Sequence, residues 1–255
     1  LNRTVTLEGK KLLAGLLKSE TLDPKVIAER QQAVQELSAM SMVMQDFQAA
    51  GKINREEGGE KEILEDWVRQ PAYYTGKKIY SYLAVILPSL TILSFTVSFF
   101  FTQLFGLSIA LYLLQLFIIG RRFTHTSRNH QTISRQLEVL RKYQLLLAII
   151  EEGAYTGKEL QHISSVLFTG ELSASRAIRS LTRIVSAFDS RLNVLAAVFL
   201  EGFLLWDIQC MIRLERWKRQ HGGNVAEWIK AIGRYDALSS LATYAFNHPV
   251  FSYPI

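Results

Sequence analysis

The sequence predicts an all-α protein, an antiparallel helical bundle with long lever-type helices and an inserted hydrophobic helical hairpin. Apolar residues recur at the three- and four-residue spacing of a helix face through most of the chain. No stretch has the alternation of a convincing strand, and an uninterrupted apolar run lies between flanks that carry the charge. We therefore expect three parts: residues 1–75 and 123–255 form the helical core and lever, and residues 76–122 form the hairpin.

Composition limits the chemistry that the chain can support. With 49% apolar residues among 255, the chain can fill a sizeable core. A net charge of +6 suits an anionic partner, either nucleic acid or the inner surface of a membrane. Cys210 is the single cysteine, which excludes an intramolecular disulfide and a Cys-rich zinc site and fits a reducing compartment. Because the chain starts without Met, we expect a piece of a larger protein.

Two helices are predicted before the apolar run. Asp23 is a helix cap, and Pro24 occupies the first helical position, where its missing N–H is no loss. One face of a long helix follows, with Val26, Ala33, Leu37, Met40, Met44 and Phe47. Gly51 and the pair Gly58 and Gly59 break it. A short amphipathic helix ends before Pro71 and carries Ile63, Leu64, Trp67 and Val68 on one side.

The apolar run, residues 79–119, contains no Asp, Glu, Lys, Arg or His. As one helix it would be about 60 Å long, twice the roughly 30 Å of a bilayer core. It therefore predicts two spans, residues 79–99 and 105–119, with a turn at residues 101–106. Each span gains about 5 kcal/mol from its large apolar side chains on the insertion scale. Pro88 should kink the first span, and a neighbouring helix or a Ser/Thr side chain must then bind the freed carbonyl.

The flanks of the run predict its orientation. Lys77 and Lys78 precede it and Arg121 and Arg122 follow it, so both flanks should stay cytoplasmic. Aromatic residues cluster where an interfacial belt would lie: Tyr73, Tyr74, Tyr80, Tyr82 and Phe123. Two alternatives remain open. The hairpin could be the buried core of a soluble bundle, although neither helix has a polar stripe, or it could be a shallow re-entrant hairpin.

Four more helical stretches are predicted after the run. The first is marked by Ile133, Leu137, Leu140 and Leu147 and is closed by Gly153. A second stripe consists of Leu160, Ile163 and Leu167. A longer helix, capped by Ser173, continues to Gly222 and presents Ile178, Leu181, Val185 and Phe188. Asn224 with Glu227 forms a variant capping box for the last helix, which His248 and Pro249 terminate.

Two segments resemble the core and lever region of the MutS family of mismatch repair proteins. The opening "LNRTVTLEGKKLLAGLL", followed by "LDPKVIAERQQAVQELS", has the family's pattern at Asn2, Thr4, Thr6, Gly9, Leu12, Leu13, Asp23, Ile27, Arg30, Gln31, Ala33, Val34 and Leu37. Near the other end, "WIKAIGRYDALSSLATYAFNHPVFSYP" is similar to the helix that closes this region, at Asp236, Leu238, Ser240, Leu241, Ala242, Ala245 and Pro254. The resemblance covers residues 1–50 and 160–255.

The resemblance implies a parent protein that binds DNA, hydrolyses ATP with Mg²⁺ and dimerises, with this piece as its mechanical connector. The ATPase itself is absent here. "GAYTGKE", residues 153–159, lacks the spacing and the hydroxyl of a P-loop and is predicted to be a helix-to-helix loop. No β-rich DNA clamp is present, and "FLE", residues 199–201, matches the Phe-x-Glu of mismatch readers by chance, since that motif belongs to an absent N-terminal domain.

A basic stretch is the main candidate binding site. Together with the lysines before the run, it offers contacts to lipid headgroups or nucleic-acid phosphates at Lys77, Lys78, Arg121, Arg122, Arg128, Arg135, Arg141 and Lys142. The five histidines have no metal-ligand spacing: His125, His130, His162, His221 and His248. Glu201 and Asp207, six residues apart in an apolar stretch, suit buried capping of a neighbouring chain segment, or contact with solvent, better than acid and base catalysis. Cys210 is predicted to be a small core residue.

These observations predict a non-catalytic connector of a MutS-like ATPase, tethered to the membrane. We expect neither a cofactor nor a metal within this chain, while ATP and Mg²⁺ belong to the adjoining ATPase domain. Its expected partners are membrane lipid, that ATPase domain, DNA, and a second copy through the parent protein. The alternative is a stand-alone helical membrane adaptor or assembly protein without nucleotide chemistry.

Overall fold

The computed structural model describes residues 2–18, 23–53, 56, 58–76, 78–120, 137–169, 172–189 and 194–253. The all-α prediction is confirmed over these residues. The only strands among them are the two-residue strands β1 (Phe168–Thr169) and β2 (Leu172–Ser173), which pair antiparallel.

The chain divides into two compact units that are discontinuous in sequence. Unit 1 comprises Leu1–Glu65, Glu138–Ser180 and Asn224–Ile255, and unit 2 comprises Asp66–Leu137 and Leu181–Gly223. This grouping differs from the sequential division expected above. The apolar hairpin does not stand by itself, because residues 181–223, which we assigned to the lever, belong to the same unit.

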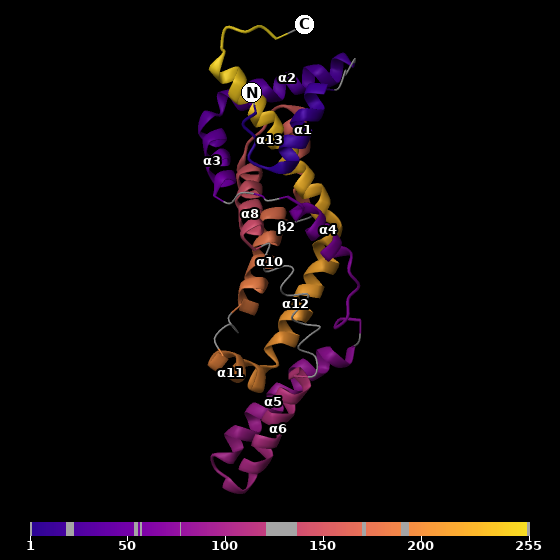
Figure 1. Ribbon diagram of the computed structural model, residues 1–255, viewed down its shortest axis with the longest axis vertical. Coiled ribbons are helices and arrows are strands. Elements are labelled where there is room, and N and C mark those ends of the chain that lie inside the picture. Colours follow the sequence, from indigo (N-terminus) through magenta and orange to yellow (C-terminus); the bar gives the residue numbers. More distant parts are fainter. Residues whose placement is uncertain are drawn as a thin grey trace. The chain divides into compact units, whose positions relative to one another are not determined.

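Unit 1 is a helical bundle built around the last helix, α13 (Val225–Asn247). It also contains α1 (Leu7–Lys18), α2 (Pro24–Ala39), α3 (Ser41–Lys52), most of α8 (Leu137–Glu152), and α9 (Lys158–Ser165). Helix α13 packs against both α1 and α2 (Figure 1). The core is filled from several helices by Leu37, Phe47, Leu146, Ile150, Leu160 and Tyr235.

Unit 2 contains the apolar hairpin and the helices that pack on it. The hairpin consists of α5 (Lys78–Ser98), the short 3-10 helix η1 (Thr102–Leu104) and α6 (Phe105–Gly120), and α5 and α6 lie side by side (Figure 1). The expected turn at residues 101–106 is present. Two more helices, α11 (Val194–Leu204) and α12 (Trp206–His221), complete the unit, and η3 (Gly222–Asn224) follows. Helices α4 (Glu60–Arg69) and α10 (Ala174–Asp189) have residues in both units.

Two predicted long helices are broken in the structure. The first is interrupted at Met40 (φ −96°, ψ 51°), which separates α2 from α3. The second, expected from Ser173 to Gly222, is divided into α10, α11 and α12. Between α11 and α12, Leu205 adopts left-handed backbone angles (φ 49°, ψ 46°) that end a right-handed helix. Apolar periodicity continued across both breaks, so the sequence pattern did not reveal them.

Helix caps were predicted with mixed success. Asp23 caps α2 as expected, because its carboxylate accepts a hydrogen bond of 2.9 Å from the backbone N–H of Lys25. Asn224 occupies the N-cap position of α13 as predicted, but its side chain makes no capping hydrogen bond, so the predicted capping box does not form. At the start of α10, Glu151 of α8 accepts a hydrogen bond of 2.7 Å from the backbone N–H of Ser175. A carboxylate distant in sequence thus caps this helix.

Candidate membrane interface and C-terminal groove

The interior of the hairpin is polar. Thr91, Ser98, Ser108 and Gln115 are buried there, although the surrounding sequence is almost entirely apolar. The Gln115 amide donates a hydrogen bond to the Thr91 hydroxyl, and Nε2 also donates to the carbonyl oxygen of Leu87 at 3.3 Å. The hydroxyls of Ser94 and Ser108 lie 2.7 Å apart. These contacts join α5 to α6 through polar groups that do not face outwards.

The outer surface of the hairpin is apolar. At its tip, Phe99 and Phe100 are 85% and 76% exposed. Large apolar side chains are exposed along both helices: Val85, Ile86, Leu90, Ile92, Leu93, Leu107, Leu113, Leu114 and Phe117. This is the reverse of a water-soluble helix pair, which buries its apolar face. The hairpin is therefore not the buried core that one of the alternatives predicted.

Length and composition distinguish the two arms of the hairpin. Helix α5 contains a stretch, Ile79–Ser98, that is long and apolar enough to cross a membrane, with 22% of its most apolar window buried. The second stretch, Thr102–Ile118, is apolar but shorter. Among the described residues, α5 alone meets both criteria. A hairpin with unequal arms accommodates either a full span or a re-entrant insertion.

Pro88 lies inside α5, and the predicted donor from a neighbouring helix is present. A proline cannot donate the backbone hydrogen bond that the carbonyl four residues earlier would accept. That carbonyl belongs to Ala84, and it accepts a hydrogen bond of 3.3 Å from Nε2 of Gln209 in α12. A neighbouring helix thus supplies the missing donor, as the sequence required.

The loop before α5 is held by a carboxylate that sequence reasoning missed. Glu215 of α12 is buried and accepts hydrogen bonds from the backbone N–H groups of Tyr73, Tyr74 and Thr75, at 2.6–2.9 Å. Tyr74 belongs to this loop, and its side chain is fully buried, so it cannot contribute to the predicted aromatic belt. Tyr82 is exposed, and Phe123 lies outside the described residues.

Helix α11 is a third apolar element of unit 2. Its packing on α6 is close, because a Cβ at Gly202 would lie 2.1 Å from the Tyr112 ring. The Tyr112 hydroxyl donates a hydrogen bond of 3.0 Å to the carbonyl oxygen of Val198. Periodicity had merged α11 with its neighbours. The signal that could have separated it is the change from an apolar stretch to the charge-rich sequence of α12.

Glu201 and Asp207 do not form an acid and base pair. Both side chains are buried, and the Glu201 carboxylate accepts a hydrogen bond of 3.1 Å from the backbone N–H of Asp207. This N–H belongs to the first turn of α12, where no carbonyl of the same helix is available to it. The predicted capping role of Glu201 is confirmed.

In unit 1, residues from the two segments that carry the MutS resemblance bind each other. Asp236 of α13 accepts hydrogen bonds from the backbone N–H groups of Val5 and Thr6 and from the Thr6 hydroxyl at 2.7 Å. A Cβ at Gly9 would lie 2.1 Å from an Asp236 carboxylate oxygen, so the glycine permits this approach. Burial raises the pKa of Asp236 from 3.8 to about 6, against the opposing effects of the Thr6 and Val5 hydrogen bonds and the Lys142 charge.

Lys142 corrects one predicted surface contact. Its side chain is 1% exposed, lies 3.0 Å from a Glu56 carboxylate oxygen and donates a hydrogen bond of 2.6 Å to the carbonyl oxygen of Val5. It therefore cannot reach lipid or nucleic acid. Arg141 is exposed and forms a surface ion pair with Glu138. The other basic candidates have side chains outside the described residues: Lys77, Lys78, Arg121, Arg122, Arg128 and Arg135.

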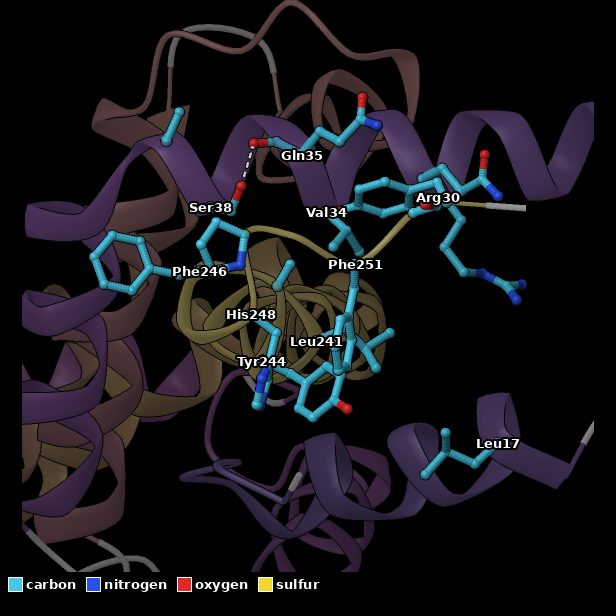
Figure 2. Close-up of a pocket in the computed structure, with 16 residues that line it drawn as sticks. Leu17, Arg30, Val34, Gln35, Ser38, Leu241, Tyr244, Phe246, His248 and Phe251 are labelled. Carbon is cyan, nitrogen blue, oxygen red and sulfur yellow. Dashed lines mark hydrogen bonds between the residues drawn. The ribbon is translucent and has the colours of Figure 1, made fainter. Parts of the chain in front are cut away.

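A groove of about 1050 Å³ lies at the C-terminal end of unit 1. Figure 2 shows its walls, with Val34 of α2 on one side, Leu17 of α1 on the other, and Tyr244 of α13 between them. The segment after α13 closes one rim, where the His248 and Phe251 rings stack 4.8 Å apart. Most of the lining is apolar, and Arg30 stands at the edge. The groove can hold an apolar segment, but it brings together no set of catalytic side chains.

In the described part of the chain, further sequence predictions concern metal ligands, the loop 153–159 and Cys210. No cluster of three His, Cys, Asp or Glu residues could hold a metal ion there. The stretch 153–157 is a loop between α8 and α9, as predicted, and the backbone N–H groups of Thr156 and Gly157 donate to the Glu36 carboxylate. Cys210 is buried, as expected of a core residue.

Comparisons of the chain with protein-family models, with curated protein sequences and with solved structures found no match.

Proposed function

We propose that this chain is a helical connector tethered to a membrane by the α5–α6 hairpin. The observation that carries the proposal is the reversed polarity of the hairpin, in which Thr91, Ser108 and Gln115 are buried while large apolar side chains face outwards. Exposure of these apolar side chains to water would be strongly unfavourable, whereas the acyl region of a bilayer covers them without that cost. Unit 1 carries a buried ion pair, Lys142 with Glu56, and an apolar core of its own, which suit the aqueous phase.

Within this function, we propose the role of a MutS-like lever. It is supported by the contact of Asp236 with Val5 and Thr6, which joins the two segments that carry the resemblance. In this role the chain is non-catalytic, and its long helices transmit the motion of an adjoining ATPase domain that holds ATP and Mg²⁺. The groove beside Tyr244 offers an apolar surface near the junction at which the resemblance places that domain.

Vesicle flotation tests the tether. Asp substitutions at three exposed positions near the middle of the spans, Leu90→Asp, Leu93→Asp and Leu113→Asp, should release the chain from vesicles, because each costs about 3 kcal/mol at the centre of a span. The matched control introduces the same charges at exposed apolar positions of unit 1, Leu17→Asp, Met42→Asp and Val250→Asp. The proposed tether would be refuted if the hairpin variant floated as well as the parent chain. It would also be refuted if the parent chain stayed in water without detergent.

The orientation of the hairpin follows from its basic flanks, Lys77 and Lys78 before it and Arg121 and Arg122 after it. We propose that both flanks are cytoplasmic. A cysteine introduced near each flank should react with a membrane-impermeant reagent only after the cell membrane is opened. Reaction in intact cells would contradict the proposed cytoplasmic orientation of the flanks, but it would not contradict the tether.

The DNA partner and the adjoining ATPase have separate tests. DNA binding should weaken steeply with salt, and Arg128→Gln with Arg135→Gln should lower the salt slope by about 2. No binding to duplex DNA at low salt would remove this part of the proposal. The coding sequence after Ile255 tests the ATPase: a P-loop shortly downstream supports the lever, and a stop codon favours the stand-alone membrane adaptor.

A further inference from the structure

We infer that α11 enters the acyl region of the membrane together with the hairpin, so that the inserted part of the chain is larger than the two hairpin helices. This inference rests on the proposed tether and extends it to a helix that the sequence assigned to the lever. The acyl chains of a lipid bilayer thus cover the exposed face of α11.

The composition of α11 suits this environment. Its sequence, VLAAVFLEGFL, contains one ionisable residue, Glu201. That side chain is buried and bound to the backbone of α12, so it does not face outwards. Helix α12, in contrast, carries several charged residues. With 11 residues, α11 is about 16 Å long, too short to cross a bilayer alone but long enough to enter one beside other helices.

The position of α11 on the hairpin gives the main argument. The Phe203 ring lies 5.2 Å from Phe95 of α5 and 5.1 Å from Tyr112 of α6. Phe95 is about 25 Å along α5 from Lys78, and Tyr112 is about 12 Å along α6 from Gly120. Helix α11 is therefore attached well inside the hairpin and not at its open end. A hairpin that inserts to this depth must carry α11 with it.

The outer face of α11 continues the apolar surface. Phe199 is 60% exposed and Val198 is 46% exposed. The Phe199 ring packs on Phe203 at 4.8 Å, and Phe203 in turn contacts both arms of the hairpin. Exposed apolar residues of α11 and of the hairpin thus belong to one packed group, which a bilayer can cover as a whole.

The irregular backbone at the end of α11 is satisfied by side chains. Backbone outside a helix is tolerated at membrane depth only where other protein groups bind its N–H and C=O groups. At the break, Glu201 accepts a hydrogen bond from Asp207 N–H. The Gln209 amide donates to the carbonyl oxygen of Leu204, the last residue of α11, at 2.7 Å. These two side chains bind one N–H and one C=O group of the break, as a site away from water requires.

Site-specific fluorescence tests the inference on the full chain. In a Cys210→Ser background, single cysteines are introduced by Phe199→Cys, Leu93→Cys or Met42→Cys and labelled with an environment-sensitive probe. The vesicles contain equal parts of phosphatidylcholine and phosphatidylglycerol, with or without acyl chains that carry a quencher. We expect blue-shifted, quenched emission at positions 199 and 93 and unchanged emission at position 42. Quenching at 93 without quenching at 199 overturns the inference and leaves the tether, whereas quenching at neither position overturns both.

A substitution in α11 provides an independent readout. Phe199→Asp places a charge on the exposed face and removes only the contact of this 60% exposed ring with Phe203, so the helical content should match that of the parent. Its partition into the same vesicles should fall at least about tenfold, because a carboxylate in the acyl region is costly. Phe199→Leu should partition like the parent. Equal partition of Phe199→Asp and the parent, at unchanged helical content, would contradict the insertion of α11.

Discussion

Gln209 donates a hydrogen bond to the carbonyl oxygen of Ala84, 3.3 Å away, and thereby binds the acceptor that Pro88 leaves without a backbone partner. The same amide binds the carbonyl oxygen of Leu204, beside the break between α11 and α12. The Gln209 side chain therefore donates hydrogen bonds at two places in unit 2 where the helical backbone is irregular. It connects the proline-containing helix of the hairpin, α5, to α12, the helix that follows α11.

Removal of this amide should destabilise unit 2. Gln209→Met keeps the length of the side chain but leaves the Ala84 carbonyl unbound, at a cost of about 1–3 kcal/mol. Pro88→Ala restores a backbone N–H to α5, so the double variant should lose less than Gln209→Met does. Unfolding in detergent micelles measures this coupling. The exposed Gln220→Met controls for composition, and an equal loss in the single and double variants would refute the link between Pro88 and Gln209.

The buried ion pair of Lys142 and Glu56 supports the N-terminal segment of unit 1. Lys142→Met should cost about 3–5 kcal/mol, because it leaves a buried Glu56 carboxylate without its cation. Adding Glu56→Gln removes that charge and should recover part of the loss, since the amide oxygen can still accept from the backbone N–H of Leu7. Urea unfolding provides the comparison.

The neighbouring residue supplies a control for the buried pair. Arg141 lies on the same helix but is exposed, and its ion pair with Glu138 is solvated. Arg141→Met should change the free energy of unfolding by less than about 1 kcal/mol. Equal destabilisation by Arg141→Met and Lys142→Met would contradict the prediction that the buried ion pair contributes more to the free energy of unfolding than the exposed one.

Asp236 should make stability depend on pH. Burial raises its pKa to about 6 from an ordinary 3.8. Because the folded-state pKa is the higher one, the stability that this group contributes is fully present below about pH 4 and is lost as the pH rises through about 6. Asp236→Asn should flatten this part of the unfolding free energy between about pH 4 and about pH 7. The exposed Asp46→Asn is the matched control, and an unchanged pH profile in Asp236→Asn would exclude Asp236 as the titrating group.

Local signals in the sequence were sufficient for parts of this architecture. Asp23 with Pro24 marked a helix start, and the absence of charge in residues 79–119 marked the hairpin and its turn. Pro88 required a donor from a neighbouring helix, because a missing N–H is a property of the residue itself. The identity of that donor depended on the fold, and 125 residues separate Gln209 from Ala84.

The remaining features depend on contacts between distant residues. Lys142 was predicted to be a surface residue because it lies in a basic stretch of the sequence. In the structure its side chain is buried, where it contacts the Glu56 carboxylate and the carbonyl oxygen of Val5. The break at Leu205 separates the apolar sequence of α11 from the charge-rich sequence of α12, but helical periodicity continues across it. Its position is explained by the Glu201 carboxylate, which replaces the hydrogen bond that the helix loses at Asp207. Periodicity reports which face is apolar, but it does not report where a buried side chain ends a helix.

The contact between Gly202 and Tyr112 should be intolerant of a methyl group. A Cβ at position 202 would lie 2.1 Å from the Tyr112 ring, so Gly202→Ala must displace the ring or α11, at a cost of about 1–3 kcal/mol. Gly106→Ala, on α6 in open space, should be neutral or stabilising by up to about 1 kcal/mol. Thermal unfolding in micelles compares them. Since the Tyr112 hydroxyl also binds the carbonyl oxygen of Val198, the displacement should loosen α11 from the hairpin, which limited proteolysis would detect as faster cleavage within α11 than in Gly106→Ala.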